Sequence, residues 1–300
     1  MAGLLRWGPR CWPGIWFGSF LVNVWVSLKA SNTEINFAIL AIAVSIGAGS
    51  TVQALAGDWL LQRWVGVGRL FERGTAIFAF AAITALVCFL ASTWGVTSLW
   101  LAGIVDKARY FDSWRTWWLG DLIGVLVVTP VILTWHQLLH IKRRPGQVGE
   151  AIVSFGLLGA ITVFIFAGPS AVEQARYPLA FLLLPCLMWL AFRFVLVGVA
   201  LAVLLMSVIA VGITSLGYGP FVREVANDSI LLLQAFMGLV TIGLILATAV
   251  HGKKQTEAAL QQLDAERGQR VRARTPELAE ANRQLGAEPL LHQQTEEKYR

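Results

Sequence analysis

The sequence predicts an all-α protein: a polytopic membrane helix bundle of about eight transmembrane helices, followed by a cytoplasmic helical segment. Hydrophobic residues make up 56% of the 300 residues and charged residues only 14%, and the mean hydropathy is +0.64. The 13 tryptophans point the same way, because tryptophan favours the membrane–water interface. Charge gathers at the end, where residues 251–300 carry nine Lys+Arg and eight Asp+Glu of the chain's 24 and 18. We therefore expect an integral membrane domain over 1–250 and a helical linker over 251–300.

Eight apolar stretches supply the expected spans. A spanning helix needs about 20 mostly apolar residues to cross a hydrocarbon core of about 30 Å. The sixth stretch is short and only Arg193 separates it from the seventh, but Pro185 favours two helices over one bent element. The expected spans are 12–30, 36–62, 74–101, 115–136, 150–168, 177–192, 194–216 and 229–250.

Basic residues predict the orientation, because cytoplasmic loops carry more Lys and Arg than outer loops. With eight spans and a cytoplasmic C-terminus, the inner segments before the tail hold nine basic residues and the outer loops hold six. The densest cluster, Lys142-Arg143-Arg144, then lies inside. We expect both termini in the cytoplasm. The net charge of +6 is assigned to this orientation in a lipid bilayer and not to nucleic-acid binding.

The charged tail is rich in helix-favouring residues. Val271, Leu278 and Leu285 recur every seven residues, a short stretch of the pattern by which helices dimerise. Pro276 fits the first position of a new helix and Pro289 interrupts the pattern. The tail is predicted to form two or three helical pieces, and a homodimer through it is expected.

The most distinctive segment begins at Trp114 and contains three tryptophans and an arginine, which predict an anchor at the outer edge of the fourth span. Asp121 follows about one turn into the apolar stretch. An unpaired carboxylate there costs a few kcal/mol. It is therefore expected to face the bundle interior, either partnered or protonated.

Two interpretations of this segment stay open. Gly120 and Gly124 allow close helix approach, and Pro130 should kink the helix, so Asp121 fits a structural polar lock. The same residues also fit a direct role in sensing a ligand or signal.

The other ionisable residues suggest less chemistry. Asp58 lies near the cytoplasmic end of its span, where a local ion pair with Arg63 or interfacial exposure is expected. His136 and His140 share a helix face, but no Cys, Asp or Glu nearby completes a metal site. Cys11, Cys88 and Cys186 are expected to be buried free thiols. No phosphate loop, nucleophile–base set or catalytic carboxylate pair is found, so we expect no metal, no cofactor and no enzyme site in this chain.

Five motifs over residues 8–250 form a recognisable set. The most specific is Trp117-Trp118-Leu119-Gly120-Asp121. Gly124-Val125-Leu126 and Thr129-Pro130 continue this motif. The other four are Trp12-Pro13-Gly14 with Gly18, residues 95–103, residues 189–194 around Arg193, and Gly217 with Gly219-Pro220-Phe221. This set resembles the membrane-associated sensor family known as MASE, first type, the input domain of bacterial sensor kinases and cyclic-di-GMP enzymes. The chain departs from the family at Val195, where a glycine is expected, and in an N-terminus that looks shorter by one span.

The resemblance implies an input domain in the bacterial inner membrane that responds to an unknown small ligand or membrane protein partner. Residues 274–285 are similar to the signalling helix that links such domains to PAS, kinase or cyclase modules, and 296–300 look like the start of a PAS domain. The residues expected to take part in sensing are Trp117, Trp118, Gly120, Asp121, Asp58 and Arg193.

Two other functions compete with this one. A small-solute transporter would favour internal repeats and ionisable residues at mid-membrane. No convincing repeat is seen, and Asp58 and Asp121 lie nearer the span ends. A structural scaffold that dimerises through its tail explains none of the motifs. A reporter fused after residue 275 would separate a sensor from a transporter.

Overall fold

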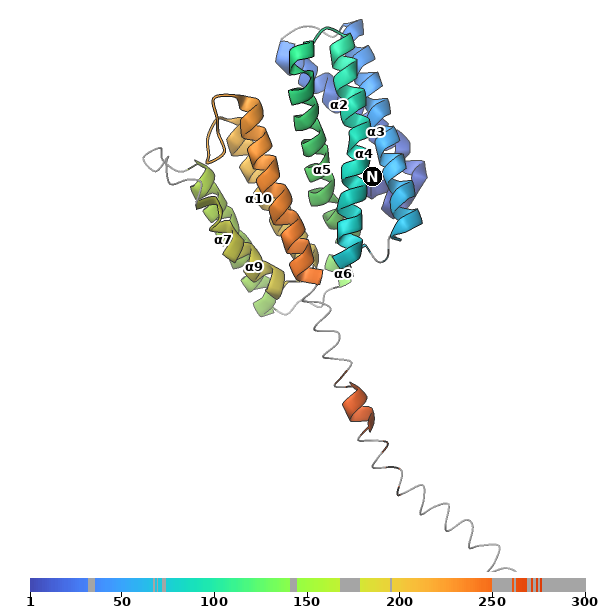
Figure 1. Ribbon diagram of the computed structural model, residues 1–300. Helices are drawn as coiled ribbons and strands as arrows, with labels where there is room; N and C mark the ends of the chain where they lie inside the picture. The colour runs from blue at the N-terminus through green and yellow to red at the C-terminus, as the bar shows by residue number, and fades with distance from the viewer. Residues whose placement is uncertain are drawn as a thin grey trace, which may run out of the picture. The chain divides into compact units, whose positions relative to one another are not determined.

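A computed structural model describes residues 1–31, 36–66, 68, 70–71, 74–140, 145–167, 179–194, 196–249, 261, 263–268, 271, 274 and 276. The chain divides into two compact units, Met1–Val250 and His251–Arg300. Every regular element in the described part is a helix (Figure 1). The predicted all-α polytopic bundle is confirmed.

Seven described helices are long and apolar enough to cross a membrane, whereas eight spans were expected. The last of them, Ala226–Ala249, is called the last span below. Six of the seven carry labels in Figure 1: α2 (Trp12–Ser31), α3 (Phe37–Trp64), α4 (Gly74–Leu101), α5 (Tyr110–Thr134), α7 (Pro145–Ala167) and α10 (Leu196–Ser215).

The sixth expected span is the one that is too short. Helix α9 (Leu183–Arg193) has 11 residues, or about 16 Å at 1.5 Å per residue, against a hydrocarbon core of about 30 Å. Pro185 explains the late start, because proline is tolerated in the first turn of a helix but not in its interior. At the other end Phe194 is extended, with φ −113° and ψ 151°, so α9 and α10 are separate helices as predicted.

The chain nevertheless returns across the bundle between α7 and α10. The guanidinium of Arg193, at the end of α9, forms an ion pair with Glu150 near the start of α7. The rings of Phe155 and Phe194 also meet there, with centroids 6.3 Å apart. Arg193 at the end of α9 therefore lies beside the start of α7, and α10 begins at that end of the bundle.

Helices α2, α3, α4 and α5 pack in sequence order, each against the next (Figure 1). Helix α10 packs against α5, α7 and α9. Buried apolar side chains from α4, α5, α9, α10 and the last span form the core, among them Phe80, Leu126, Leu187, Met206 and Met237. Helix α5 thus lies at the centre of the membrane unit.

A short helix that the sequence did not predict, α1 (Ala2–Trp7), precedes α2. It packs against α3 and α5 and its Leu4 is completely buried. A short 3₁₀ turn, Pro9–Cys11, joins it to α2. Two further short elements border α5, a 3₁₀ turn Lys107–Arg109 before it and α6 (Gln137–His140) after it.

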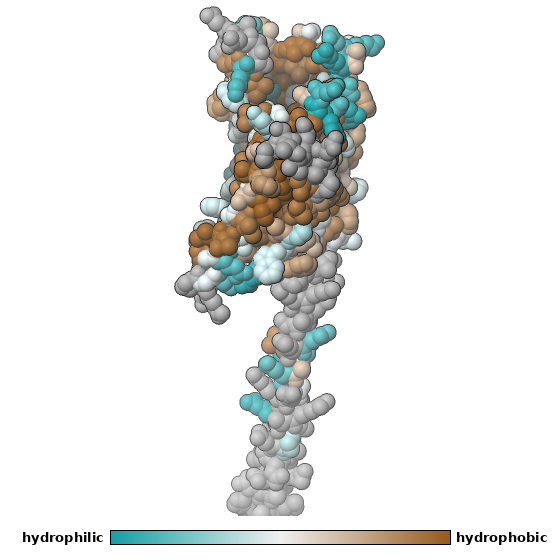
Figure 2. Space-filling model, turned by 90° about the vertical axis from the view of Figure 1, so that its left-hand side faces the viewer, coloured by the Kyte–Doolittle hydropathy of each residue, from teal (hydrophilic) through white to brown (hydrophobic). Residues whose placement is uncertain are grey.

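The outer surface of the membrane unit is apolar. Large side chains such as Phe78, Leu86, Val208 and Leu239 are exposed. Figure 2 shows a hydrophobic band across the unit, with hydrophilic groups toward both ends of the band. Apolar surface of this kind is stable only against lipid, so the unit lies in a lipid bilayer.

In the tail, the described residues 261, 263–268, 271, 274 and 276 are helical. Val271 is exposed. Leu278, Leu285, Pro289 and the residues similar to a PAS start lie outside the described residues.

Candidate functional site

The tryptophan-rich segment occupies the first half of α5. The helix continues through Pro130 to Thr134 without a break, and Pro130 itself is buried. One side of α5 faces α4 and another faces the last span. The expected sensing residues of this segment therefore lie between two helices, whereas Asp58 is on α3 and Arg193 on α9.

Trp114 and Trp118, one helical turn apart, join α5 to α4. The indole N–H of Trp114 donates to Thr93 Oγ1 at 3.0 Å, and that of Trp118 donates to the carbonyl oxygen of Ala85 at 2.9 Å. The two indoles are stacked with centroids 6.1 Å apart, and the ring of Phe89 contacts both. These indole N–H groups are thus bonded to protein rather than to the membrane interface.

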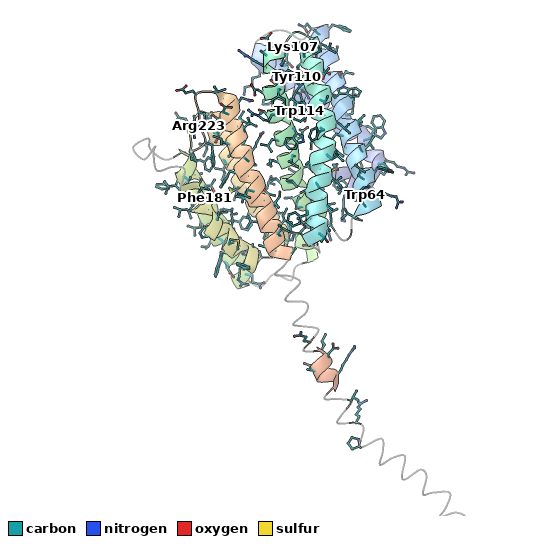
Figure 3. All side chains as sticks on the ribbon, in the orientation of Figure 1. Trp64, Lys107, Tyr110, Trp114, Phe181 and Arg223 are labelled. Atoms are coloured by element: carbon teal, nitrogen blue, oxygen red, sulfur yellow. The ribbon has the colours of Figure 1, made fainter. Side chains whose placement is uncertain are left out.

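Tyr110 and Trp117 complete the contact with α4. The Tyr110 hydroxyl lies 2.8 Å from Thr97 Oγ1, and Figure 3 shows Tyr110 and Trp114 following each other along α5. The indole of Trp117 packs on Gly95 so closely that a Cβ on that glycine would lie 2.8 Å from ring carbons. Gly95 therefore permits this approach of the two helices.

On another side, Gly120 meets the last span. A Cβ at Gly120 would lie 2.8 Å from Gln234 Nε2. Further along, a Cβ at Gly238 of the last span would lie 2.5 Å from the side chain of Ile123. The predicted close approach at Gly120 is present, whereas Gly124 has nothing within 4 Å of its Cβ position and borders a cavity.

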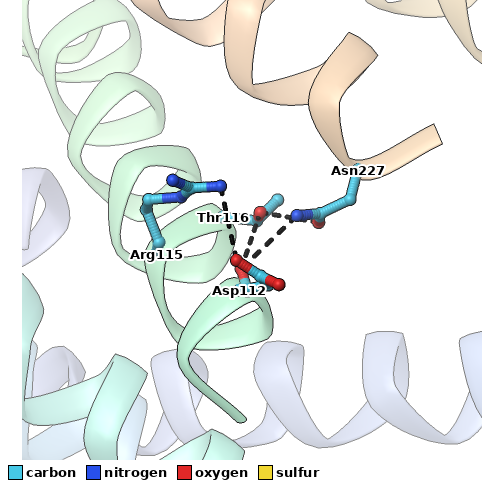
Figure 4. A network of polar contacts seen from close by, with 4 residues as sticks. All are labelled: Asp112, Arg115, Thr116 and Asn227. Carbon is cyan, nitrogen blue, oxygen red and sulfur yellow. Dashed lines mark hydrogen bonds and ion pairs between the residues drawn. The ribbon is translucent and has the colours of Figure 1, made fainter. Parts of the chain in front are cut away.

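A polar network ties the first turn of α5 to the start of the last span (Figure 4). Thr116 Oγ1 donates to Asn227 Oδ1 at 2.6 Å and lies 3.0 Å from the carbonyl oxygen of Asp112. Asn227 Nδ2 reaches the same carbonyl at 3.5 Å, and Arg115 pairs with the Asp112 carboxylate at 3.4 Å. The sequence did not predict this contact, which joins residues 111 positions apart.

Asp121 lies partly buried on α5. Among the described residues, no hydrogen bond or ion pair reaches its carboxylate. It lies within electrostatic range of the Cys88 thiol, which is completely buried in α4. Asp121 therefore faces the bundle interior, as predicted, but without the polar partner that a structural lock requires.

The expectation for Asp58 is wrong. Asp58 is only 5% exposed, and both of its carboxylate oxygens accept from Gln62 Nε2 at 2.9 Å. Residue 62 lies one turn along α3, on the face of Asp58, whereas a residue five positions away such as Arg63 points elsewhere. Burial against α1 and the amide of Gln62 replace the expected ion pair and interfacial exposure.

The N-terminus packs beside Asp58, because the Met1 side chain fills the space next to Gly57. The amino group of Met1 lies within electrostatic range of Asp58 and of Cys88, the thiol that Asp121 also approaches. Burial lowers the pKa of this amino group, and the charge of Asp58 opposes the shift. Arg193 stands apart, exposed and paired with Glu150: its Nη2 lies 2.6 Å from Glu150 Oε2.

The cysteines are free thiols: Cys88 is buried, whereas Cys11 and Cys186 are only half-buried. Within the described residues, no group of three or more His, Cys, Asp and Glu side chains is arranged to hold a metal ion. The functional residues that the sequence did not reveal are Thr116, Asn227 and Gln234. A polar residue in an apolar run is a visible signal, but its partner on another helix is not.

Within the described residues, seven long apolar helices define a multi-pass membrane protein. The central one, α5, carries tryptophan, aspartate and glycine on its contact faces. The chain belongs to the MASE1 family, whose family model matches residues 1–254. MASE1 is a membrane sensory domain found in signalling proteins, so this chain has a sensory-input role. The family resemblance seen in the motifs is thereby confirmed. None of the curated proteins and none of the solved structures matches the chain.

Proposed function

We propose that residues 1–250 are the sensory input domain of a bacterial signalling protein of the sensor histidine kinase or cyclic-di-GMP enzyme type. The observation that carries the proposal is the direct contact between the tryptophan-rich part of α5 and the last span. That span is the helix that leads into the tail, which would connect to an output module. A homodimer through residues 251–300 would give the output module its symmetry.

The contact network gives the signal a route. Trp114, Trp117 and Trp118 hold α5 against α4, while Thr116 and Gly120 hold it against the last span. A stimulus that changes the packing of α5 on α4 therefore also changes the Thr116–Asn227 contact. For such a signal the stimulus must prefer one of two helix arrangements, and couplings of this kind typically change an equilibrium about 5- to 150-fold.

We also propose that the protein lies in the inner membrane with both ends in the cytoplasm. The last span ends at the same end of the bundle as α6, and the basic cluster 142–144 follows α6 in the sequence (Figure 1). Because α9 ends beside the start of α7, at the end of the bundle where α10 begins, the short α9 leaves the alternation of the eight segments unchanged.

The test is a fusion of residues 1–275 to a reporter kinase or cyclase, with Asp121→Asn as the variant. The Asp121 carboxylate has no partner in the described part of the chain and lies between the helices that are proposed to move. We therefore expect the reporter output of the Asp121→Asn fusion to differ about 5-fold or more from that of the unchanged fusion. Asp106→Asn, an exposed loop residue before α5, is the matched control and should leave the output unchanged. The proposal fails if Asp121→Asn and every stimulus tried leave the output unaltered while proteoliposomes containing the protein move a solute.

A further inference from the structure

A cavity of about 520 Å³ lies between α5, α10 and the last span. Its size falls within the range of small-molecule sites, about 300–1,000 Å³. Gly124 and Gly212 leave space on its walls, since nothing lies within 4 Å of either Cβ position. Val208, Val211 and Ile230 also line it and are exposed on the outer surface, so the cavity opens toward lipid.

Three residues that line this cavity each carry a buried polar atom without a hydrogen-bond partner among the described residues: Ser207 Oγ, Thr214 Oγ1 and Gln234 Oε1. Ser207 and Thr214 are only 5% and 7% exposed. They lie two turns apart on α10 and so share a face. A buried polar group left unpaired pays its full desolvation cost, so three of them around one space indicate that something else fills it.

The hydroxyls elsewhere in these helices behave differently. Thr134, at the end of α5, donates to the carbonyl of Pro130 at 2.6 Å, and Thr241 of the last span donates to that of Met237 at 2.6 Å. Such bonds to the preceding turn are the usual solution for a hydroxyl in a helix. Ser207 and Thr214 could each donate to a carbonyl oxygen of the preceding turn but do not, so neither hydroxyl has a partner among the described residues. A ligand could supply that partner.

The polar atoms also define the ligand's chemistry. Gln234 Oε1 only accepts, so the ligand must supply an O–H or N–H donor. A hydroxyl of Ser207 or Thr214 either donates or accepts. None of the described residues that line the cavity is charged, and an ion buried there would have no counter-charge.

We propose that this cavity binds a small uncharged apolar molecule bearing a hydroxyl group, which enters from the lipid. Its hydroxyl pairs with Gln234 and with Ser207 or Thr214, and its apolar body fills the space beside Gly124 and Gly212. The proposed binding site does not depend on the proposed sensory function. Its role as the stimulus rests on the proposed sensory function, because the cavity wall includes the two helices joined by Thr116 and Asn227.

The test measures equilibrium binding of 1-naphthol to the full chain in lipid nanodiscs, with empty nanodiscs subtracted. We expect saturable binding of one molecule per chain, tighter than that of naphthalene, which has the same ring system without the hydroxyl. Gln234→Leu should weaken 1-naphthol binding about tenfold, the effect of one hydrogen bond to a neutral group, and leave naphthalene binding unchanged.

Two cavity-filling variants and a matched control locate the site. Gly124→Leu and Gly212→Leu place a side chain in the cavity without a clash, because nothing lies within 4 Å of either Cβ position. Both should lower the affinity for 1-naphthol at least about tenfold. Gly156→Leu on α7 is equally unobstructed but does not line the cavity, so it should bind like the unchanged protein.

Binding that does not saturate, or that is the same in Gly124→Leu and Gly156→Leu, overturns the site. Equal binding of naphthalene and 1-naphthol overturns the role of the polar atoms. If 1-naphthol binds as expected but leaves the reporter output unchanged, the site stands and its sensory role fails. If Asp121→Asn changes the output but 1-naphthol does not bind, the proposed function stands and this site fails.

Discussion

Asp58 and Asp121 are both aspartates within apolar helices, but their surroundings are opposite. Asp58 is buried and its carboxylate accepts two contacts at 2.9 Å from Gln62. Asp121 has no such partner among the described residues. A residue that keeps an unsatisfied carboxyl group in an apolar helix loses stability by doing so, which suits a functional group better than a structural one.

The two aspartates should therefore respond in opposite ways to loss of charge. Asp58→Asn weakens hydrogen bonds to a charged acceptor and should lower the free energy of unfolding by about 1.5 kcal/mol. Asp121→Asn removes an unpartnered carboxyl group and should raise it by about 1 kcal/mol or more. Thermal unfolding in detergent, followed by tryptophan fluorescence, measures both. Destabilisation by Asp121→Asn as large as that by Asp58→Asn would show that the Asp121 carboxyl group has a stabilising partner.

At the residue scale, the sequence identified the unusual side chains but not their partners. Asp121 is unusual by its position alone, because a carboxylate in a membrane span is rare. Gln62 was not predicted as the partner of Asp58, since Arg63 carries the opposite charge and lies one residue further along. The helix period decides between them, because residue 62 shares a face with Asp58.

Glycine sets the spacing of the helices around α5. Gly95 lets Trp117 lie against the backbone of α4, and Gly120 lets Gln234 lie against that of α5. Gly14 of α2, in contrast, has nothing within 4 Å. A pattern of glycines in apolar runs thus contains both contact positions and open ones, and only the structure distinguishes them.

Gly95→Ala should push the Trp117 indole away from α4, because the new Cβ would lie 2.8 Å from its ring carbons. Overpacking of this kind costs about 1–3 kcal/mol. Gly14→Ala adds the same methyl group without a clash and should not destabilise the protein. Thermal unfolding of the two variants side by side gives the comparison. Equal unfolding temperatures would contradict the close packing of Trp117 on Gly95.

Helix ends were predictable where local chemistry sets them. The apolar run 74–101 and α4 have the same bounds. Hydropathy alone placed the sixth span too early, because it does not register that Pro185 must lie in the first turn of its helix. The contact between Thr116 and Asn227 could not be predicted from the sequence. The two residues are 111 positions apart, and no local pattern relates them.

For the whole molecule, the central question is how the chain alternates across the membrane. In the described part of the chain, seven helices are long enough to span it and α9 is not. The Arg193–Glu150 ion pair nevertheless places the end of α9 beside the start of α7. The proposed orientation, with both ends in the cytoplasm, follows from this return together with the basic cluster 142–144.

Cysteine labelling tests this orientation. In a background without Cys11, Cys88 and Cys186, Lys107→Cys before α5 should react with a membrane-impermeant maleimide in intact cells. Gln147→Cys, exposed in the first turn of α7, should react only after permeabilisation. Labelling of both positions from the same side would contradict the alternation, and labelling in the reverse order would place the ends outside.

In the proposed function, a change in the packing of α5 reaches the last span through the contact between Thr116 and Asn227. The most direct measurement is the output of the 1–275 reporter fusion carrying Thr116→Val, compared with Thr97→Val. Each variant removes one hydroxyl that bonds between helices, but Thr97 bonds Tyr110 at the α4 side and not the last span. We predict that Thr116→Val abolishes the response of the fusion to Asp121→Asn, whereas Thr97→Val retains it. An equal response in both would contradict the claim.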